Sequence, residues 1–225
     1  MKRSEINRII NEGRAFFDKN NFYLPEWGYW SPEEWKLRKM ELYSEVFEHN
    51  LGWDITDFGS GDFTKRGLVL FTIRNGSSAN KGKTYCEKIM IVEEEQETPL
   101  HYHWHKTEDI INRGGGNLVM ELFASNNDGE VTKDNVTVSI DGGLKELKPG
   151  EKLFLSPGQS ICLTPGLYHR FYGESGSGKV LTGEVSTVND DAHDNRFYQE
   201  IGRFPDIEED EAPVHFLVSD YSRFL

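Results

Sequence analysis

The chain has 225 residues, enough for one large domain with a buried core. Its 25 Lys and Arg residues are outnumbered by 38 Asp and Glu residues, and the formal charge of −13 would repel a nucleic-acid backbone. We therefore expect no nucleic-acid partner. No apolar run approaches the ~20 residues that a membrane span needs, so we expect no membrane partner either.

The first 50 residues predict two helices. Ser4 can cap a helix that runs to about Asn20, because apolar side chains recur there at helical spacing. Ser31 begins a second helical signal, in which Pro32 suits the first helical position and Glu34 completes a capping box. We expect this second helix to dock on the body of the protein through Trp35, Leu42, Val46 and Phe47.

The N-terminal segment and the cysteines indicate the compartment. The first residues are basic but lack the apolar segment of a secretory signal. Cys86 and Cys162 have no CxxC spacing, which is typical of buried thiols in a reducing compartment. We therefore expect a cytoplasmic protein.

From residue 51 onward the sequence is typical of a β-protein. Eight β-rich runs alternate with Gly, Asn and Asp turns, which predicts an antiparallel sandwich or barrel. The NNDGE segment at residues 126–130 indicates a hairpin turn. We expect a mainly β fold that forms a single structural unit: a helical extension at residues 1–50 packs on a β-barrel at residues 51–225, and the barrel ends in an irregular tail.

The segment HYHWHKTED at residues 101–109 holds three histidines. If it forms a strand, His101, His103 and His105 point to one face. At ~3.3 Å per residue the outer two lie roughly 13 Å apart, too far for one ion with metal–nitrogen bonds of ~2 Å. The pair His101 and His103 leaves Glu108 five residues on, which gives the strand room to turn back. We expect these three residues to share one metal ion.

This spacing resembles the first motif of the cupin superfamily. In that motif two histidines one residue apart are followed by a glutamate and then a glycine. His101, His103, Glu108 and Gly115 stand at the matching positions. The resemblance implies a cupin barrel, a double-stranded β-helix of jelly-roll type, with a metal at its centre.

The second cupin motif supplies the remaining ligand. Gly158, Gly166 and His169 fall in register with it, although Pro165 stands one residue late and Gly173 replaces the usual asparagine. These departures concern turn residues, so they affect loop geometry more than metal binding. The resemblance implies His169 as the fourth ligand. Three imidazoles and one carboxylate suit a borderline divalent ion such as Mn²⁺, Fe²⁺, Zn²⁺, Ni²⁺ or Co²⁺.

A longer resemblance covers nearly the entire chain. The N-terminal segments MKRSEINRII and FYLPEWGYWSPEEW, the strand HYHWHKTEDI, and the runs LTPGLYHRFYG and NDDAHDNRF are similar to the D-lyxose isomerase family of metal-dependent cupins. This resemblance implies interconversion of D-lyxose and D-xylulose, often with activity on D-mannose and D-fructose, usually on Mn²⁺. Cupins commonly dimerise through sheet edges, so we expect a homodimer.

The implied chemistry is an aldose–ketose isomerisation through a cis-enediol, with a divalent cation as Lewis acid toward the two reacting oxygens. A hydride shift is the alternative that the sequence leaves open. Three residues are candidates for the acid–base steps. Glu184 either faces the barrel interior, where it could act as the base, or faces solvent. Glu108 is the second candidate base, and Lys106 is the third, either polarising a carbonyl or lying on the surface.

Sugar binding needs many hydrogen-bonding groups and an apolar floor. Lys88 alternates with inward apolar residues and either faces the cavity or solvent. In the run at residues 189–197, one or two of the acids Asp190, Asp191 and Asp194 could bind sugar hydroxyls while Arg196 ties the loop down. A polar surface turn is the alternative. Trp30 either lines the mouth of the pocket or staples the helices to the sheet.

Three other functions compete with this prediction. A cupin-type sugar-phosphate isomerase needs a basic cluster for the phosphate, and the sequence shows none near the metal motif. A cupin dioxygenase can use the same ligands, so ligand identity does not exclude it. A cupin that binds sugar without turnover is the third.

Overall fold

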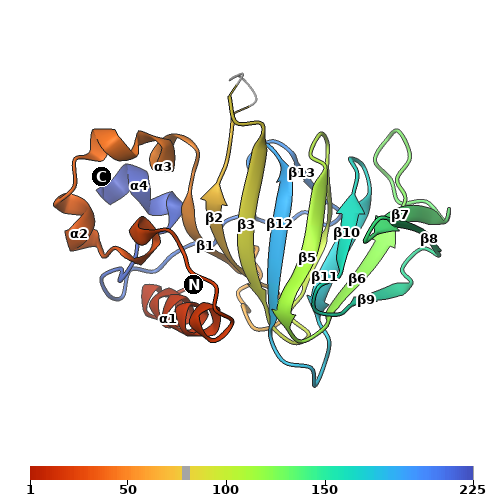
Figure 1. The fold of residues 1–225 in the computed structure, drawn as a ribbon, viewed down its shortest axis with the longest axis horizontal. Coiled ribbons are helices and arrows are strands. Elements are labelled where there is room, and N and C mark those ends of the chain that lie inside the picture. Colours follow the sequence, from red (N-terminus) through yellow and green to blue (C-terminus); the bar gives the residue numbers. More distant parts are fainter. Residues whose placement is uncertain (78–81, 225) are drawn as a thin grey trace.

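The computed structural model describes residues 1–77 and 82–224 (Figure 1). In this part of the chain, strands form two sheets whose neighbours all pair antiparallel. The larger sheet runs, in spatial order, β1 Gly52–Thr56, β2 Leu68–Arg74, β3 Tyr85–Val92, β12 Val180–Thr187, β5 Glu108–Gly115, β10 Ser160–Leu163, β7 Val136–Ile140 and β8 Gly143–Leu147. The smaller sheet runs β13 Asn195–Phe197, β4 Thr98–His103, β11 Tyr168–Gly173, β6 Leu118–Phe123 and β9 Lys152–Leu155. The predicted mainly β fold is confirmed.

The two sheets enclose the main apolar core. Because side chains alternate along a strand, one face of each sheet turns apolar residues inward. Buried core residues come from both sheets and include Leu70, Met90, Ile110, Met120, Leu153, Ile161 and Phe171. Buried polar and charged residues gather at one end of this core, where β4, β11 and β12 approach each other, and the candidate site lies there.

A second apolar cluster joins the first helix to the outer face of the larger sheet. Helix α1 spans Arg3–Lys19, close to the predicted bounds, and buries its apolar stripe. The stripe packs on β1, β2 and β3 through residues that include Ile6, Ile10, Phe17, Trp53, Val69, Phe71 and Ile91. Ser4 is not the cap that we predicted. Lys2 precedes the helix, and the backbone N–H and hydroxyl of Ser4 both donate to the carboxylate of Asp210.

The second predicted helix is broken into three pieces. Helix α2, Pro32–Lys36, begins with the expected capping box of Ser31 and Glu34. It is followed by a 3-10 helix at Met40–Tyr43 and by α3, Ser44–Glu48. The break allows Trp30, Trp35 and Tyr43 to meet edge to face, which a straight helix would prevent. Leu42 does not dock on the body, because it is 74% exposed.

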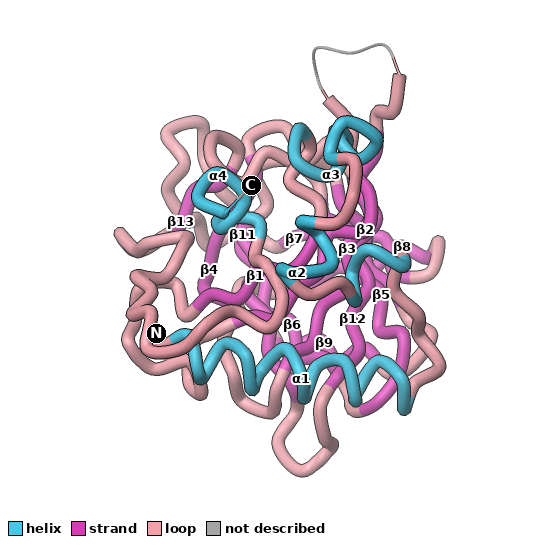
Figure 2. Tube along the Cα trace, turned by 90° about the vertical axis from the view of Figure 1, so that its left-hand side faces the viewer, coloured by secondary structure: helices cyan, strands magenta, loops and turns pink. Residues whose placement is uncertain are grey.

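The C-terminal tail returns to the N-terminal helices. After β13 it passes α1 and ends in a 3-10 helix at Val218–Asp220 and in α4, Tyr221–Phe224. Figures 1 and 2 show α4 lying beside α2 and α3, at the end of the molecule where β1 is found. Arg3 fixes this arrangement by donating to Glu209 and Asp220. Among the described helices, none combines the length and apolarity required to cross a membrane.

The NNDGE segment forms a turn, but not between two directly paired strands. The backbone N–H of Asn126 donates to the carbonyl of Glu130, and Ser125 bridges to Val131. Beyond this bridge the chain changes sheets, because β6 belongs to the smaller sheet and β7 to the larger. The hairpin prediction was therefore right about the turn and wrong about the strand pairing.

Candidate active site

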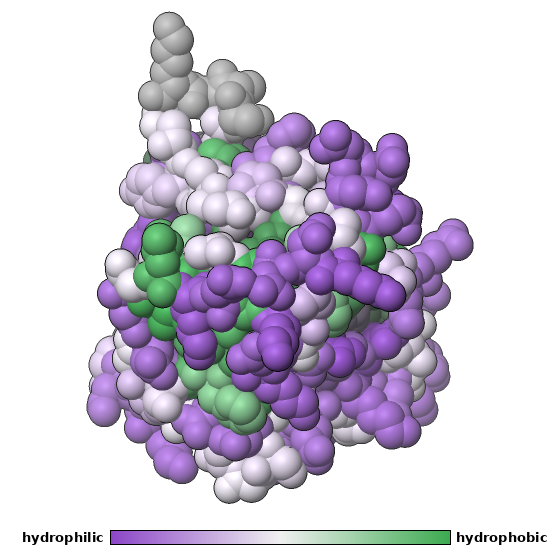
Figure 3. All heavy atoms as spheres, turned by 90° about the vertical axis from the view of Figure 1, so that its right-hand side faces the viewer, coloured by the Kyte–Doolittle hydropathy of each residue, from purple (hydrophilic) through white to green (hydrophobic). Residues whose placement is uncertain are grey.

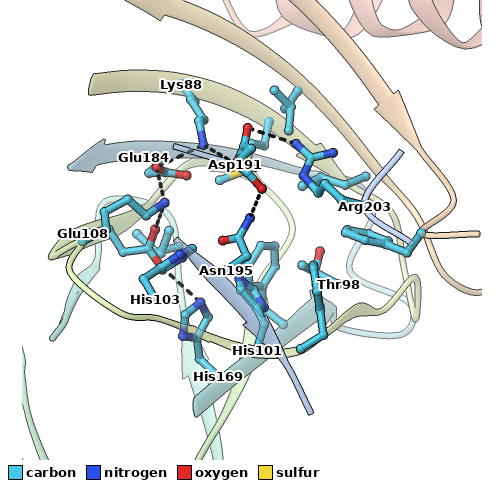
Figure 4. Close-up of a pocket in the computed structure, with 18 residues that line it drawn as sticks. Lys88, Thr98, His101, His103, Glu108, His169, Glu184, Asp191, Asn195 and Arg203 are labelled. Carbon is cyan, nitrogen blue, oxygen red and sulfur yellow. Dashed lines mark hydrogen bonds and ion pairs between the residues drawn. The ribbon is translucent and has the colours of Figure 1, made fainter. Parts of the chain in front are cut away.

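A small cavity of about 50 Å³ opens between the two sheets at the polar end of the core (Figure 4). One part of its wall is apolar and includes Phe58, Leu70, Met90, Ile110, Phe171 and Phe197. The remainder is polar or charged and consists of Lys88, Thr98, His101, His103, Lys106, Glu108, His169, Glu184, Asp191, Asn195 and Arg203.

Three buried histidines lie together in this wall. His101 and His103 stand on the same face of β4, and His169 on β11 pairs in register with His101. One ring nitrogen from each lies within 4.8 Å of the other two. Atoms held this closely can share one ion, because metal–nitrogen bonds are about 2 Å long.

The backbone orients two of these rings. Nδ1 of His101 donates to the carbonyl of Pro99 at 2.7 Å, and Nδ1 of His169 donates to the carbonyl of Leu167 at 3.0 Å. Since a carbonyl only accepts, each ring keeps Nε2 free to bind a metal. Among the described residues, His169 Nε2 and His103 Nδ1 have no hydrogen-bond partner although both are buried. Burial lowers the pKa of His101 and of His103, which favours neutral imidazoles. The donor set therefore fits a divalent metal ion.

Glu108 adds a carboxylate next to the imidazoles. Its Oε1 lies 3.1 Å from Nε2 of His169 and 3.4 Å from Nε2 of His103. Its Oε2 lies 2.7 Å from Nζ of Lys106. Burial alone would raise the pKa of Glu108, but Lys106 and His103 outweigh it and hold that pKa well below the ordinary value. Glu108 is thus an anion at the edge of the three-histidine group.

The segment 101–109 is not one strand, as we had assumed when comparing the three histidines. Strand β4 ends at His103, and β5 begins at Glu108. Asp194 stabilises the turn between them, because its carboxylate accepts the backbone N–H groups of His105 and Lys106 at 2.8 and 3.0 Å. The turn leaves His105 exposed and directs Lys106 into the cavity. The 13 Å separation expected for an extended strand therefore does not apply.

A chain of charged side chains runs from Glu108 across the cavity. Nζ of Lys106 lies 2.9 Å from Oε1 of Glu184, and Nζ of Lys88 lies 3.4 Å from the same oxygen. Burial would raise the pKa of Glu184, but the two lysines lower it below its ordinary value. Lys106 shows the reverse balance, because Glu108 and Glu184 raise its pKa despite the burial that would lower it. Both members of the pair are charged, and Glu184 faces inward rather than toward solvent.

The far side of the cavity contains Asp191, one of the acids predicted as candidates for sugar binding, and two residues that were not predicted, Asn195 and Arg203. Asp191 lies 3.7 Å from Nζ of Lys88 and 3.2 Å from Nη2 of Arg203. The side-chain amide of Asn195 donates to the Asp191 backbone carbonyl. Asn195 belongs to the same NDDAHDNRF run as Asp191, and the polar composition of that run could have predicted both as cavity residues. Arg203 lies in the tail, outside this run, and no sequence pattern indicated it.

The other residues that we predicted to bind sugar lie elsewhere. Asp190 is exposed and pairs with His193 at 3.0 Å. Arg196 is directed outward, where it donates to the carbonyl of Asp128. Trp30 is buried in the aromatic cluster of the helices. It therefore has the packing role that was the alternative to lining the pocket. None of these three, nor Asp194, is among the residues that line the cavity, whereas Lys88 is.

The whole chain also resembles known proteins. The sequence pattern of the family described as D-lyxose isomerase matches residues 1–221. The chain belongs to this family. A D-lyxose/D-mannose isomerase of Serratia proteamaculans is 49% identical over 227 residues, and one of Escherichia coli O157:H7 is 48% identical over 226 residues. Each alignment covers 100% of both chains. Membership of the D-lyxose isomerase family confirms the predicted enzyme class, a sugar aldose–ketose isomerase.

Solved structures support the fold of this D-lyxose isomerase family member. An L-ribose isomerase of Cellulomonas parahominis, solved with L-ribose, superposes with a TM-score of 0.61 at 15% identity. The L-ribose isomerase of Geodermatophilus obscurus superposes with a TM-score of 0.60 at 16% identity. Both comparisons cover 92% of this chain and 98% of the other. At these identities the likeness shows the fold alone, and it agrees with the predicted cupin barrel.

Proposed function

We propose that this protein interconverts D-lyxose and D-xylulose, and that it also accepts D-mannose and D-fructose. The substrate assignment is supported by the two full-length relatives, whose names give D-lyxose and D-mannose. The observation that carries the proposal is the buried three-histidine group beside the Glu108–Lys106–Glu184 chain. This arrangement supports a proposal in which a metal ion and a carboxylate base act in one cavity.

The metal ligands in this proposal are His101, His103 and His169, with Glu108 as the fourth. Mn²⁺ is our preferred ion, and Zn²⁺, Co²⁺, Ni²⁺ and Fe²⁺ suit the same donors. When bound, the ion supplies a Lewis acid for neighbouring oxygens of the sugar. The carbonyls of Pro99 and Leu167 keep two of the imidazoles in the orientation that the ion needs.

Glu184 is the proposed base. Its Oε1 accepts from Lys106 and from the hydroxyl of Ser186, at 2.9 and 3.1 Å, which fixes the carboxylate in place. In the aldose-to-ketose direction, Glu184 takes the proton from C2 and returns it to C1 by way of a cis-enediol. A second proton moves from O2 to O1, and Lys106 is placed to donate to the oxygen that gains it. Glu108 is the alternative base, but its contacts with the imidazoles favour a ligand role.

The cations of the cavity argue against a sugar phosphate as substrate. Lys88, Lys106 and Arg203 each lie within 4 Å of at least two carboxylates. Since their charge is already balanced, the cavity offers a phosphate dianion no free cationic cluster in the part of the chain that is described. A neutral sugar suits this wall better.

The deciding experiment is an aldose panel on protein stripped with EDTA and reloaded with Mn²⁺. We expect ketose to form from D-lyxose and D-mannose, and activity to disappear in the stripped protein. Failure of folded, metal-loaded protein to make D-xylulose from D-lyxose would overturn the assignment. Oxygen uptake by an Fe²⁺-loaded sample would favour the dioxygenase alternative instead.

We also propose that the protein forms a homodimer and is located in the cytoplasm. Strand β8 is an edge strand on which Leu144 is 81% exposed, and Phe154 on the other sheet's edge strand, β9, is 47% exposed. Figure 3 shows this end of the molecule, where hydrophobic residues lie among hydrophilic ones. A second copy would cover such edges. Light scattering should give the mass of a dimer, and Leu144→Glu should reduce that mass.

Both cysteines are free, as suits a reducing compartment such as the cytoplasm.

A further inference from the structure

Strand β4 carries a β-bulge directly before its metal-binding histidines. His101 pairs with His169 and Thr98 pairs with Phe171, so three residue steps on β4 oppose two on β11. Strict alternation from His101 would turn Pro99, not Thr98, toward the cavity. The extra residue reverses the alternation, and Thr98 lines the cavity together with His101 and His103. A bulge that re-aims a side chain in this way is common beside active sites.

The hydroxyl of Thr98 has no partner within the described part of the protein. The residue is 3% exposed, and its Oγ1 is buried without a hydrogen bond. Figure 4 shows Thr98 on the side of the cavity opposite Glu108 and Glu184. A buried hydroxyl without a partner is costly, so it is expected to meet a polar group that the protein does not provide.

The surroundings of Thr98 restrict what that polar group can be. Phe171, its strand partner, and Phe197 contribute apolar surface to the same cavity. A small neutral molecule with both C–H surface and hydroxyl groups fits this combination, as a sugar does. Across the cavity lies Glu184, beside which the reacting carbons C1 and C2 belong in the proposed reaction.

We propose that the Thr98 hydroxyl binds a hydroxyl group of the sugar beyond the reacting carbons, at C3, C4 or C5, and thereby helps to determine specificity. This inference rests on the proposed isomerase function for the orientation of the sugar. It assigns a second role to the bulge, which both presents the Pro99 carbonyl to His101 and turns Thr98 inward. A substrate that lacks the partner hydroxyl would leave Thr98 unpaired and would bind less tightly.

The test uses Thr98→Val, which removes the hydroxyl and keeps the shape, and Thr98→Ser, which keeps the hydroxyl. Thr182→Val is the matched control, because Thr182 also has a buried hydroxyl without a partner among the described residues but does not line the cavity. Binding is measured on metal-loaded protein by calorimetry with D-arabitol, the alditol of D-lyxose, which has no carbonyl to isomerise. We expect Thr98→Val to weaken binding by roughly 5- to 100-fold. The other two variants should stay within about 3-fold of the wild type.

Deoxy sugars identify the partner hydroxyl. With 3-, 4- and 5-deoxy-D-lyxose, the loss in kcat/KM caused by Thr98→Val should vanish for one analogue and persist for the other two. Equal losses for all three analogues would indicate a change of shape and would overturn the proposal, as would unchanged D-arabitol binding by Thr98→Val. If wild-type protein binds D-arabitol but does not isomerise D-lyxose, the proposed function fails, while the effect of Thr98→Val on D-arabitol binding still decides whether the contact exists.

Discussion

Lys106 donates to Glu184 at 2.9 Å although the two residues are 78 positions apart in the chain. Lys106 comes from the turn after β4, and Glu184 comes from β12 in the opposite sheet. The ion pair therefore spans the two sheets at the cavity, and it places a fixed carboxylate beside the three-histidine group.

Replacing Glu184 by Gln should abolish proton transfer while leaving the metal site intact. The amide keeps the shape of the carboxylate but cannot accept a proton from carbon, and we expect kcat to fall by about 10²- to 10⁴-fold. Metal content, measured by mass spectrometry, should match the wild type, since Glu184 is not one of the proposed ligands. Solvent-exchange of the C2 proton should fall with kcat. If this variant retains a near-normal kcat, Glu184 is not the base and Glu108 becomes the candidate.

The three-histidine group predicts a sharp contrast between neighbouring histidines. His103→Ala removes one of three grouped imidazoles, so both the bound metal and the isomerase activity should fall to background. His105→Ala removes an exposed ring outside the group and should keep one metal per chain and at least half of the activity. Metal analysis together with ketose formation checks both variants. Retention of metal by the first and loss by the second would refute the ligand assignment.

The sequence predicted the features that depend on local pattern. Alternating apolar residues and turn signals led to the β fold, and the capping box at Ser31 is present. The spacing of His101, His103 and Glu108 selected a set that the structure brings together, because these residues lie on two strands joined by one short turn. The helix after Ser31 was predicted too long, since its break depends on aromatic packing between residues far apart in the chain.

The features that the sequence could not show arise from tertiary contacts. Arg203 reaches Asp191 and Asp54 only because the tail crosses the end of the cavity. Thr98 faces inward only because of a bulge, which interrupts the alternation that sequence reasoning assumes. The polar composition of its segment predicted Asp194 as a sugar ligand, whereas its carboxylate accepts hydrogen bonds from two backbone N–H groups.

This contact makes Asp194 a positioning residue for Lys106. In Asp194→Ala the turn at residues 104–107 loses both hydrogen bonds, and Nζ of Lys106 shifts relative to Glu184. Since small misplacements at a reacting centre are costly, we expect kcat to fall by about 10- to 100-fold with a smaller change in KM. Asp190→Ala, in the same loop but exposed and outside the cavity lining, should remain within about 2-fold of the wild type. Equal effects from both variants would point to general loosening of the loop.

The buried guanidinium of Arg3 should dominate the attachment of the C-terminal tail. It donates to Asp220, and the two side chains are only 0% and 1% exposed. Replacing Arg3 by Met leaves the buried Asp220 carboxylate without its cationic partner, which costs about 3 kcal/mol or more. For a chain of this size that loss corresponds to a fall in Tm of roughly 6–12 °C.

Arg8 on the same helix provides the control. It pairs with Glu12 at 2.8 Å, but the two side chains are 57% and 50% exposed, so water screens the pair. Arg8→Met should change the free energy of unfolding by less than about 0.5 kcal/mol. Thermal denaturation followed by circular dichroism compares the two variants directly. A Tm for Arg3→Met within 2 °C of the Arg8→Met value would mean that the tail is held mainly by its apolar contacts, such as those of Phe216 and Leu217, rather than by the ion pair.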